Sequence, residues 1–162
     1  MAKEIERKFI VNTDHWRPAD SGIHIRQGYL PISGKTVVRI RISGDRAWLT
    51  LKGENKGMVR QEFEYPIPLP DAGQILENLC VRPFIEKTRY PVKFAGADWS
   101  VDVFEGDNAG LVVAEIELLS EDQKIILPPW AGAEVTDDPR YYNSSLNAHP
   151  YSTFRPRNTD RI

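Results

Sequence analysis

The stretch EIERKF, residues 4–9, decides how the rest of this chain is interpreted. Side chains of a β-strand alternate between its two faces, so Glu4, Glu6 and Lys8 share one face while apolar side chains occupy the other. The two carboxylates would stand about 7 Å apart, with an ammonium group next in line. Because Glu and Lys are poor strand formers, such a face is unusual, and the first question is whether it points into water or into the protein.

The composition predicts a single globular domain of ordinary character. The chain has 162 residues, of which 41% are hydrophobic and 27% charged, and its formal net charge is −2, so no basic excess indicates a nucleic-acid partner. Its apolar runs are too short to cross a bilayer, and its start, MAKEIERKFIV, lacks the apolar core of a signal peptide. The lone Cys80 excludes an intramolecular disulfide. We therefore expect a cytoplasmic protein without nucleic-acid or membrane partners; the sequence leaves a homodimer open.

Alternating segments separated by turn residues predict an antiparallel α+β protein with about eight strands. The clearest helix is expected over residues 69–80, and short helices are expected within residues 138–148. The order of residues 149–162 does not follow from the sequence. The expected strands cover residues 3–11, 23–31, 36–42, 46–52, 57–66, 83–94, 97–106 and 110–119.

Most of these strands repeat the charged alternation of the first. The carboxylates on the charged face are Glu4, Glu6, Glu62, Glu64, Asp102, Glu115 and Glu117. The cations on it are Lys8, Arg39, Arg41, Lys52, Lys87 and Arg89, with Arg26 as a further candidate. Carboxylates concentrate in the first and last strands, and cations in strands between them.

Two arrangements accommodate such a face. An antiparallel sheet can expose one face to water and pair opposite charges across its strands. Alternatively, the sheet closes into a barrel whose interior holds the charges. Solvated faces usually mix in Ser, Thr and Gln, which are few at these positions, so the barrel is favoured. Because unpaired buried charges are costly, a charged interior implies a ligand with both signs of charge, and a polyphosphate with Mg²⁺ or Mn²⁺ fits that requirement.

Ordered motifs along the chain resemble the CYTH superfamily, the triphosphate tunnel metalloenzymes. EIERK at residues 4–8 matches the ExExK signature of that family. The resemblance spans roughly residues 3–148 and is most similar to the short bacterial tripolyphosphatase branch. The later matches, in family order, are VRIR (38–41), LTLKG (49–53), EFEY (62–65), EKTRY (86–90), VDVFEG (101–106), AEIEL (114–118) and EVTDDPRYYNSSL (134–146).

The resemblance implies an α+β fold in which a closed antiparallel β-barrel forms a triphosphate tunnel, with helices packed outside. The tunnel domain would cover residues 1–148, and residues 149–162 would be a C-terminal tail. Tyr141 and Asn143 would serve mainly structural roles.

The resemblance also implies roles for the charged residues. Metal would be held by Glu4, Glu6, Glu115 and Glu117, and phosphate by Lys8, Arg39, Arg41, Lys52, Lys87 and Arg89. Glu62, Glu64 and Asp102 would bind a second metal, orient the cations through salt bridges, or do both. The expected catalytic set is Glu4, Glu6, Lys8, Glu115 and Glu117.

The expected activity is metal-dependent hydrolysis of a triphosphate, with inorganic tripolyphosphate giving pyrophosphate and phosphate. In phosphoryl transfer, the protein mainly positions the reacting groups and neutralises the charge of the phosphates, and this set of charged residues suits both tasks. Three alternatives stay open: a class IV adenylate cyclase that converts ATP to cyclic AMP, a thiamine triphosphatase, and a non-catalytic module that binds polyphosphate or nucleotide. The small-molecule triphosphate is the expected partner in all of them.

Overall fold

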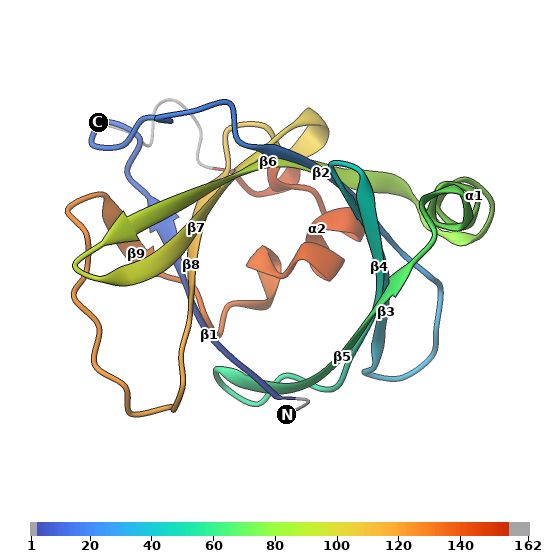
Figure 1. Cartoon of the computed structure of the whole chain (residues 1–162), viewed down its shortest axis with the longest axis horizontal. Coiled ribbons are helices and arrows are strands. Elements are labelled where there is room, and N and C mark those ends of the chain that lie inside the picture. Colours follow the sequence, from blue (N-terminus) through green and yellow to red (C-terminus); the bar gives the residue numbers. More distant parts are fainter. Residues whose placement is uncertain (1–2, 156–162) are drawn as a thin grey trace.

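The structure is a computed structural model that describes residues 3–155, and its strands form a ring with a helix inside it (Figure 1). The strands make one 9-stranded sheet in the order β5-β4-β3-β2-β6-β7-β8-β1-β9. An additional β5–β1 pairing closes strands β1 to β8 into the antiparallel barrel that the sequence predicts. The strand bounds are β1 (Lys3–Val11), β2 (Ile23–Tyr29), β3 (Val37–Ser43), β4 (Arg46–Lys52), β5 (Val59–Ile67), β6 (Val81–Phe94), β7 (Ala97–Phe104), β8 (Val112–Glu117) and β9 (Ala131–Glu134).

Strand β1 is where the barrel closes. Its first residues pair with β5, with Glu4 opposite Arg60 and Ile5 opposite Val59. Its other edge pairs with β8, with Glu6 opposite Glu117. Because β1 bonds to both neighbours, the EIERKF segment has little freedom to rotate its charged face.

Strand β9 is a feature that the sequence did not predict. It pairs with the C-terminal half of β1, on the edge that β5 leaves free. Its sequence, AGAE, contains no β-branched or aromatic residue, so it has no strand signal of its own. Gly132 permits the close approach, since a Cβ there would stand 2.9 Å from the carbonyl oxygen of Ile10.

The apolar faces of the strands point outward and are covered by other segments. On one side, Phe9, Trp99 and Ile116 pack with Trp130, which comes from the segment between β8 and β9. On the other side, α1 (Leu69–Leu79) buries Leu76 against Ile40 of β3. The outward position of α1 agrees with the prediction that helices pack outside the barrel.

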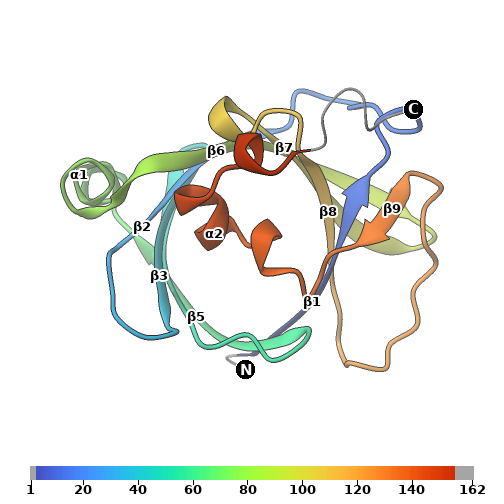
Figure 2. The same cartoon turned by 180° about the vertical axis from the view of Figure 1, so that it is seen from behind.

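The second helix, α2 (Asn143–Ala148), differs from that prediction, since it lies within the ring in both views (Figures 1 and 2). Its Leu146 is fully buried among inward-facing Ile85 and Val113, together with Tyr151. The inward-facing side chains of the strands are apolar at this end of the barrel, so α2 packs against a hydrophobic surface. Short 3₁₀ helices lie nearby at Gly106–Asn108, Pro139–Tyr141 and Tyr151–Thr153.

Part of the expected C-terminal tail belongs to this packing. Tyr151 is buried, and its ring meets Phe154 edge-on with centroids 5.4 Å apart. Residues 156–162 of the expected tail lie outside the described residues. Across the described chain, no helix is both long and apolar enough to cross a membrane.

Substitution of Leu146 tests whether α2 packs inside the barrel. We expect Leu146→Ala to lower the free energy of unfolding by about 2–5 kcal/mol, because it leaves a cavity in a fully buried site. Urea denaturation measures this change. The matched control is Leu79→Ala at the end of α1, where the side chain is 56% exposed, and its effect should stay within about 0.5 kcal/mol. Equal effects of the two variants on the free energy of unfolding would contradict the packing of α2 inside the barrel.

Candidate functional site

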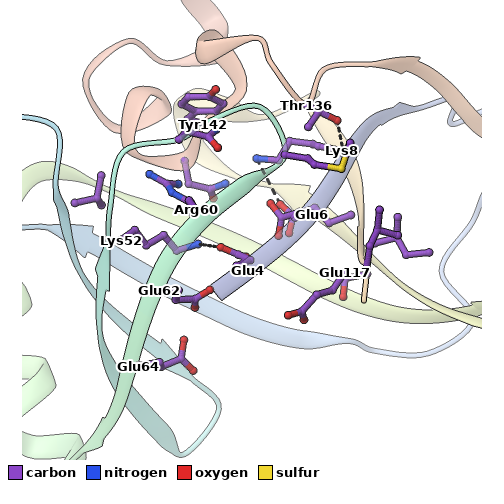
Figure 3. A pocket seen from close by; sticks show the side chains of 18 of the residues that line it. Glu4, Glu6, Lys8, Lys52, Arg60, Glu62, Glu64, Glu117, Thr136 and Tyr142 are labelled. Carbon is purple, nitrogen blue, oxygen red and sulfur yellow. Dashed lines mark hydrogen bonds and ion pairs between the residues drawn. The ribbon is translucent and has the colours of Figure 1, made fainter. Parts of the chain in front are cut away.

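A charged cavity of about 770 Å³ lies inside the barrel. In Figure 3, Glu4, Glu6 and Lys8 of β1 face the same space as Glu62 and Glu64 of β5. The charged face of EIERKF therefore points inward. The predicted residues that line the cavity are Glu4, Glu6, Lys8, Arg39, Arg41, Lys52, Glu62, Glu64, Lys87, Arg89, Glu115 and Glu117.

Asp102 lies in the cavity wall, behind the cations it binds. Its carboxylate is 2.9 Å from the Lys87 ammonium and accepts two hydrogen bonds from Arg89, at 2.7 Å and 2.9 Å. Burial raises the pKa of Asp102, but the charges of Lys87 and Arg89 outweigh burial and hold it well below its usual range. Asp102 is therefore ionised, and both its oxygens are engaged by cations.

Asp102 raises the pKa of both cations, but the net shifts have opposite signs because burial outweighs this effect at Lys87 and not at Arg89. Burial lowers the pKa of Lys87 to about 8, although Asp102 opposes that shift. Burial also acts against the charge on Arg89, but the Asp102 carboxylate outweighs it and raises the pKa of Arg89. Lys87 is thus the cation in this group that most readily loses its proton.

Glu64 organises the two arginines of β3. Its carboxylate oxygens lie 3.7 Å from Arg39 and 3.6 Å from Arg41, and one of them accepts a hydrogen bond from the Thr50 hydroxyl at 3.2 Å. Burial, together with the charges of Arg39 and Arg89, lowers the pKa of Arg41 to about 10. Among the described residues, the buried Nε atoms of Arg39 and Arg41 have no hydrogen-bond partner.

Carboxylates crowd together around β1. Glu4 bonds to the Lys52 ammonium at 3.1 Å; burial raises the pKa of Glu4, but Lys52 and the neighbouring carboxyl groups bring it down to about 2. Burial and the charges of Glu115 and Glu4 raise the pKa of Glu6 well above 4.5. Burial and contact with Glu4 raise the pKa of Glu62 to about 7, against the pull of Lys52. This excess of negative charge would be relieved by a proton or by a bound cation.

Lys8 lies between the carboxylates and the C-terminal segment. Its ammonium is 3.6 Å from Glu115 and donates to the Tyr141 carbonyl at 3.3 Å. It also stands over the Tyr142 ring, 5.9 Å from the centroid. Burial lowers the pKa of Lys8, but Glu115 and Glu6 outweigh burial and raise it. Lys8 therefore stays charged.

Several residues that line the cavity were not expected there. Tyr29 of β2, Arg60 of β5 and Asn143 of α2 all line it. Arg60 continues the alternation of Glu62 and Glu64, so the sequence did contain a signal for it. Asn143 was expected to be structural; it lines the cavity because α2 lies inside the ring.

Arg26 was a candidate for the inner face of the barrel, and that prediction is wrong because its side chain lies on the outer face. Its guanidinium lies 3.7 Å from Glu77 of α1 and 3.5 Å from Glu86, and it stands over the Phe84 ring at 5.6 Å. The inward face of β2 carries Gln27 and Tyr29 instead.

A second group of polar residues lies on this outer surface. His24, Glu86 and Glu105 place one ligand atom each within 4.8 Å of one another, and they are the one group of three among the described residues that does so. All three side chains are about half exposed. Among the described residues, no three carboxylates of the tunnel converge to that distance.

The chain is similar to proteins of known family and, in some cases, of known activity. A family model of the CYTH domain matches residues 2–147. An inorganic triphosphatase of Acetivibrio thermocellus is 48% identical over 155 residues, covering 96% of this chain and 99% of the relative. An inorganic triphosphatase of Nitrosomonas europaea is 41% identical over 150 residues, covering 88% and 95%. The crystal structure of the inorganic triphosphatase NE1496 superimposes with a TM-score of 0.66 at 38% identity, covering 91% of this chain and 95% of that one.

The ion pairs of Asp102 yield a stability prediction. Asp102→Asn should lower the free energy of unfolding at neutral pH by about 3 kcal/mol, because it leaves buried positive charge without its partner. The pKa of Asp102 is depressed in the folded state, so its contribution exists above its usual 3.8 and is lost as the pH falls below that value. The difference between the two proteins should therefore shrink in acid.

Urea denaturation at several pH values measures this difference. The matched control is Asp98→Asn, because Asp98 pairs with Lys93 at 3.7 Å but is 82% exposed, and its effect should stay within about 0.5 kcal/mol. A difference that is small at neutral pH, or that grows in acid, would contradict the role given to Asp102.

Proposed function

This chain belongs to the CYTH domain family, and on that premise we propose that it hydrolyses inorganic triphosphates, with tripolyphosphate as its substrate. The observation that carries the proposal is the cavity, in which carboxylates and cations predicted from strand alternation line one space. The inorganic triphosphatases at 48% and 41% identity support the same activity.

The cations would hold the triphosphate. Arginines bind phosphate oxygens through two parallel hydrogen bonds, and Arg39 and Arg41 both line the cavity. Lys52 of β4 and Lys87 of β6 add point charges from neighbouring strands of the same wall. Asp102 and Glu64 would orient these cations, since both already bind two of them. That assignment leaves Glu62 as the carboxylate available to a second metal.

The metal would lie against β1 and β8. Glu6 and Glu117 are opposite each other in the sheet, and Glu115 is opposite Lys8, so these carboxylates share one wall with Glu4. The donor set fits Mg²⁺ or Mn²⁺, because carboxylate oxygens suit these ions and the described lining contains neither imidazole nor thiolate. When bound, such an ion neutralises phosphate charge and acidifies a water. Glu6, Glu115 or Glu117 would position that water.

A substrate panel tests the proposal. Purified protein is incubated with tripolyphosphate, ATP, thiamine triphosphate or pyrophosphate, each with Mg²⁺, Mn²⁺ or EDTA, and phosphate, pyrophosphate and cyclic AMP are measured separately. We expect metal-dependent phosphate release, fastest from tripolyphosphate. Cyclic AMP formation would indicate the cyclase alternative, and binding without turnover the non-catalytic one. A cytoplasmic location, a homodimer and the absence of a nucleic-acid partner stay predictions from the sequence.

Arg41 lines the cavity, which makes it a residue to substitute. Arg41→Ala should lower kcat/KM for tripolyphosphate by about 100-fold, because it removes an oriented charge from the phosphate site. Steady-state phosphate release measures the change. Arg26→Ala is the matched control, since Arg26 lies outside the barrel and its loss removes the same charge. Similar losses in both variants would show that net charge, not the tunnel site, accounts for the effect.

The crowded carboxylates predict that metal binding releases protons. The pKa of Glu6 is raised, and that of Glu62 is raised to about 7, so metal affinity should rise with pH as these groups ionise. Calorimetric titration with Mg²⁺ in buffers of different ionisation enthalpy measures the protons released. Glu6→Gln should release fewer protons and bind Mg²⁺ more weakly. Affinity that is independent of pH would count against the carboxylate site.

A further inference from the structure

Asn143 connects the helix inside the ring to the charged wall of the tunnel. Its side-chain oxygen accepts one hydrogen bond from the Lys87 ammonium and another from the Gln27 amide, both at 2.9 Å. Lys87 and Gln27 are almost completely buried, at 2% and 0% exposure. The contact therefore joins α2 to two side chains that have little freedom to find other partners.

The chemistry of these groups fixes the direction of each hydrogen bond. An ammonium can only donate, so Asn143 must turn its oxygen toward Lys87. The same oxygen then requires Gln27 to present its NH₂ group, which also donates to the Tyr29 hydroxyl at 3.0 Å. Since the oxygen of Tyr29 accepts this bond, its own O–H is free to donate elsewhere.

Both ends of this chain of hydrogen bonds face the cavity. Lys87 and Tyr29 line it. The Lys87 ammonium has three N–H groups, of which Asp102 and Asn143 engage two, so one is left for a ligand. Burial raises the pKa of Tyr29, so its hydroxyl keeps the proton that it can donate. A polyanion in the tunnel meets two donors whose directions are set by one amide.

We infer that Asn143 is a positioning residue, which through Lys87 and Gln27 fixes how the tunnel presents its N–H and O–H donors to a triphosphate. The inference rests on the proposed function. It assigns to α2 a part in the reaction beyond filling the apolar end of the barrel. The competing explanation is that Asn143 only fastens α2, and the two explanations differ in measurable ways.

A neighbouring residue supplies the matched control. Asn147 of the same helix donates to the backbone carbonyl oxygens of Val81, at 3.4 Å, and Pro83. It is buried but does not line the cavity. Asn147→Ala therefore loosens α2 without removing an acceptor from Lys87.

The experiment compares stability and steady-state kinetics of these variants on tripolyphosphate. We expect Asn143→Ala to lower kcat/KM by about 10- to 100-fold, the effect of losing a hydrogen bond to a charged group. Asn147→Ala should be destabilised yet keep kcat/KM within about twofold. Asn143→Asp, which retains the acceptor, should recover kcat but raise KM, because its charge repels phosphate. It also serves as the second variant if Asn143→Ala does not fold.

A double-mutant cycle with Lys87→Met completes the test. Asn143 acts through Lys87 and Gln27, so Asn143→Ala should lower kcat/KM clearly less in the Lys87→Met background than in the unaltered protein, because only the Gln27 arm is then left to lose. A full effect in that background, or an equal loss in Asn147→Ala, would overturn the inference.

If the proposed triphosphatase activity itself were wrong, the result would differ from a failure of the Asn143 inference. The unaltered protein would then release no phosphate from any triphosphate. The same cycle could still be measured as tripolyphosphate affinity in EDTA by calorimetry.

Discussion

Every charge inside this barrel depends on the register of the sheet. An unpaired buried charge costs several kcal/mol, so a charged interior is stable only if opposite charges meet. The strand pairing brings them together, since Lys8 is opposite Glu115 and Arg89 is opposite Asp102. A slip of one residue in any strand would turn its charges outward and its apolar side chains into the tunnel. The core outside the barrel and the site inside it therefore depend on the same register.

The charged side chains of the tunnel differ in how completely they are paired with opposite charges. The incompletely paired ones indicate where a ligand would bind. Asp102 is engaged by two cations at both oxygens, so it is a fixed part of the wall. Burial, together with the charges of Glu115 and Glu4, raises the pKa of Glu6, and the charges of Lys8 and Lys52 do not offset that rise. Arg41 likewise retains a donor without a partner among the described residues. Groups of both signs are thus left incompletely paired, and a metal triphosphate complex matches both.

Much of this could be predicted from the sequence because alternation is a local property. The period of two in EIERKF, and its repetition in later strands, was sufficient to predict the barrel and the inward direction of Glu6 and Lys8. The barrel predicted at the outset is confirmed. Alternation could not place Arg26, because an amphipathic side chain on β2 can satisfy its charge on the outer face, and there it meets Glu77 of α1.

What local patterns could not predict are the contacts made by the C-terminal segment. Strand β9 forms because β1 offers it a free edge, and α2 enters the ring because the inward face turns apolar near Ile85. Leu146 and Asn143 stand three residues apart on that helix, one in the apolar packing and the other at Lys87. Helical spacing of three places both on neighbouring positions of one face. The same hydrophobic contact that completes the fold therefore delivers a polar group to the charged wall, which links the stability of this end of the barrel to the geometry of the site.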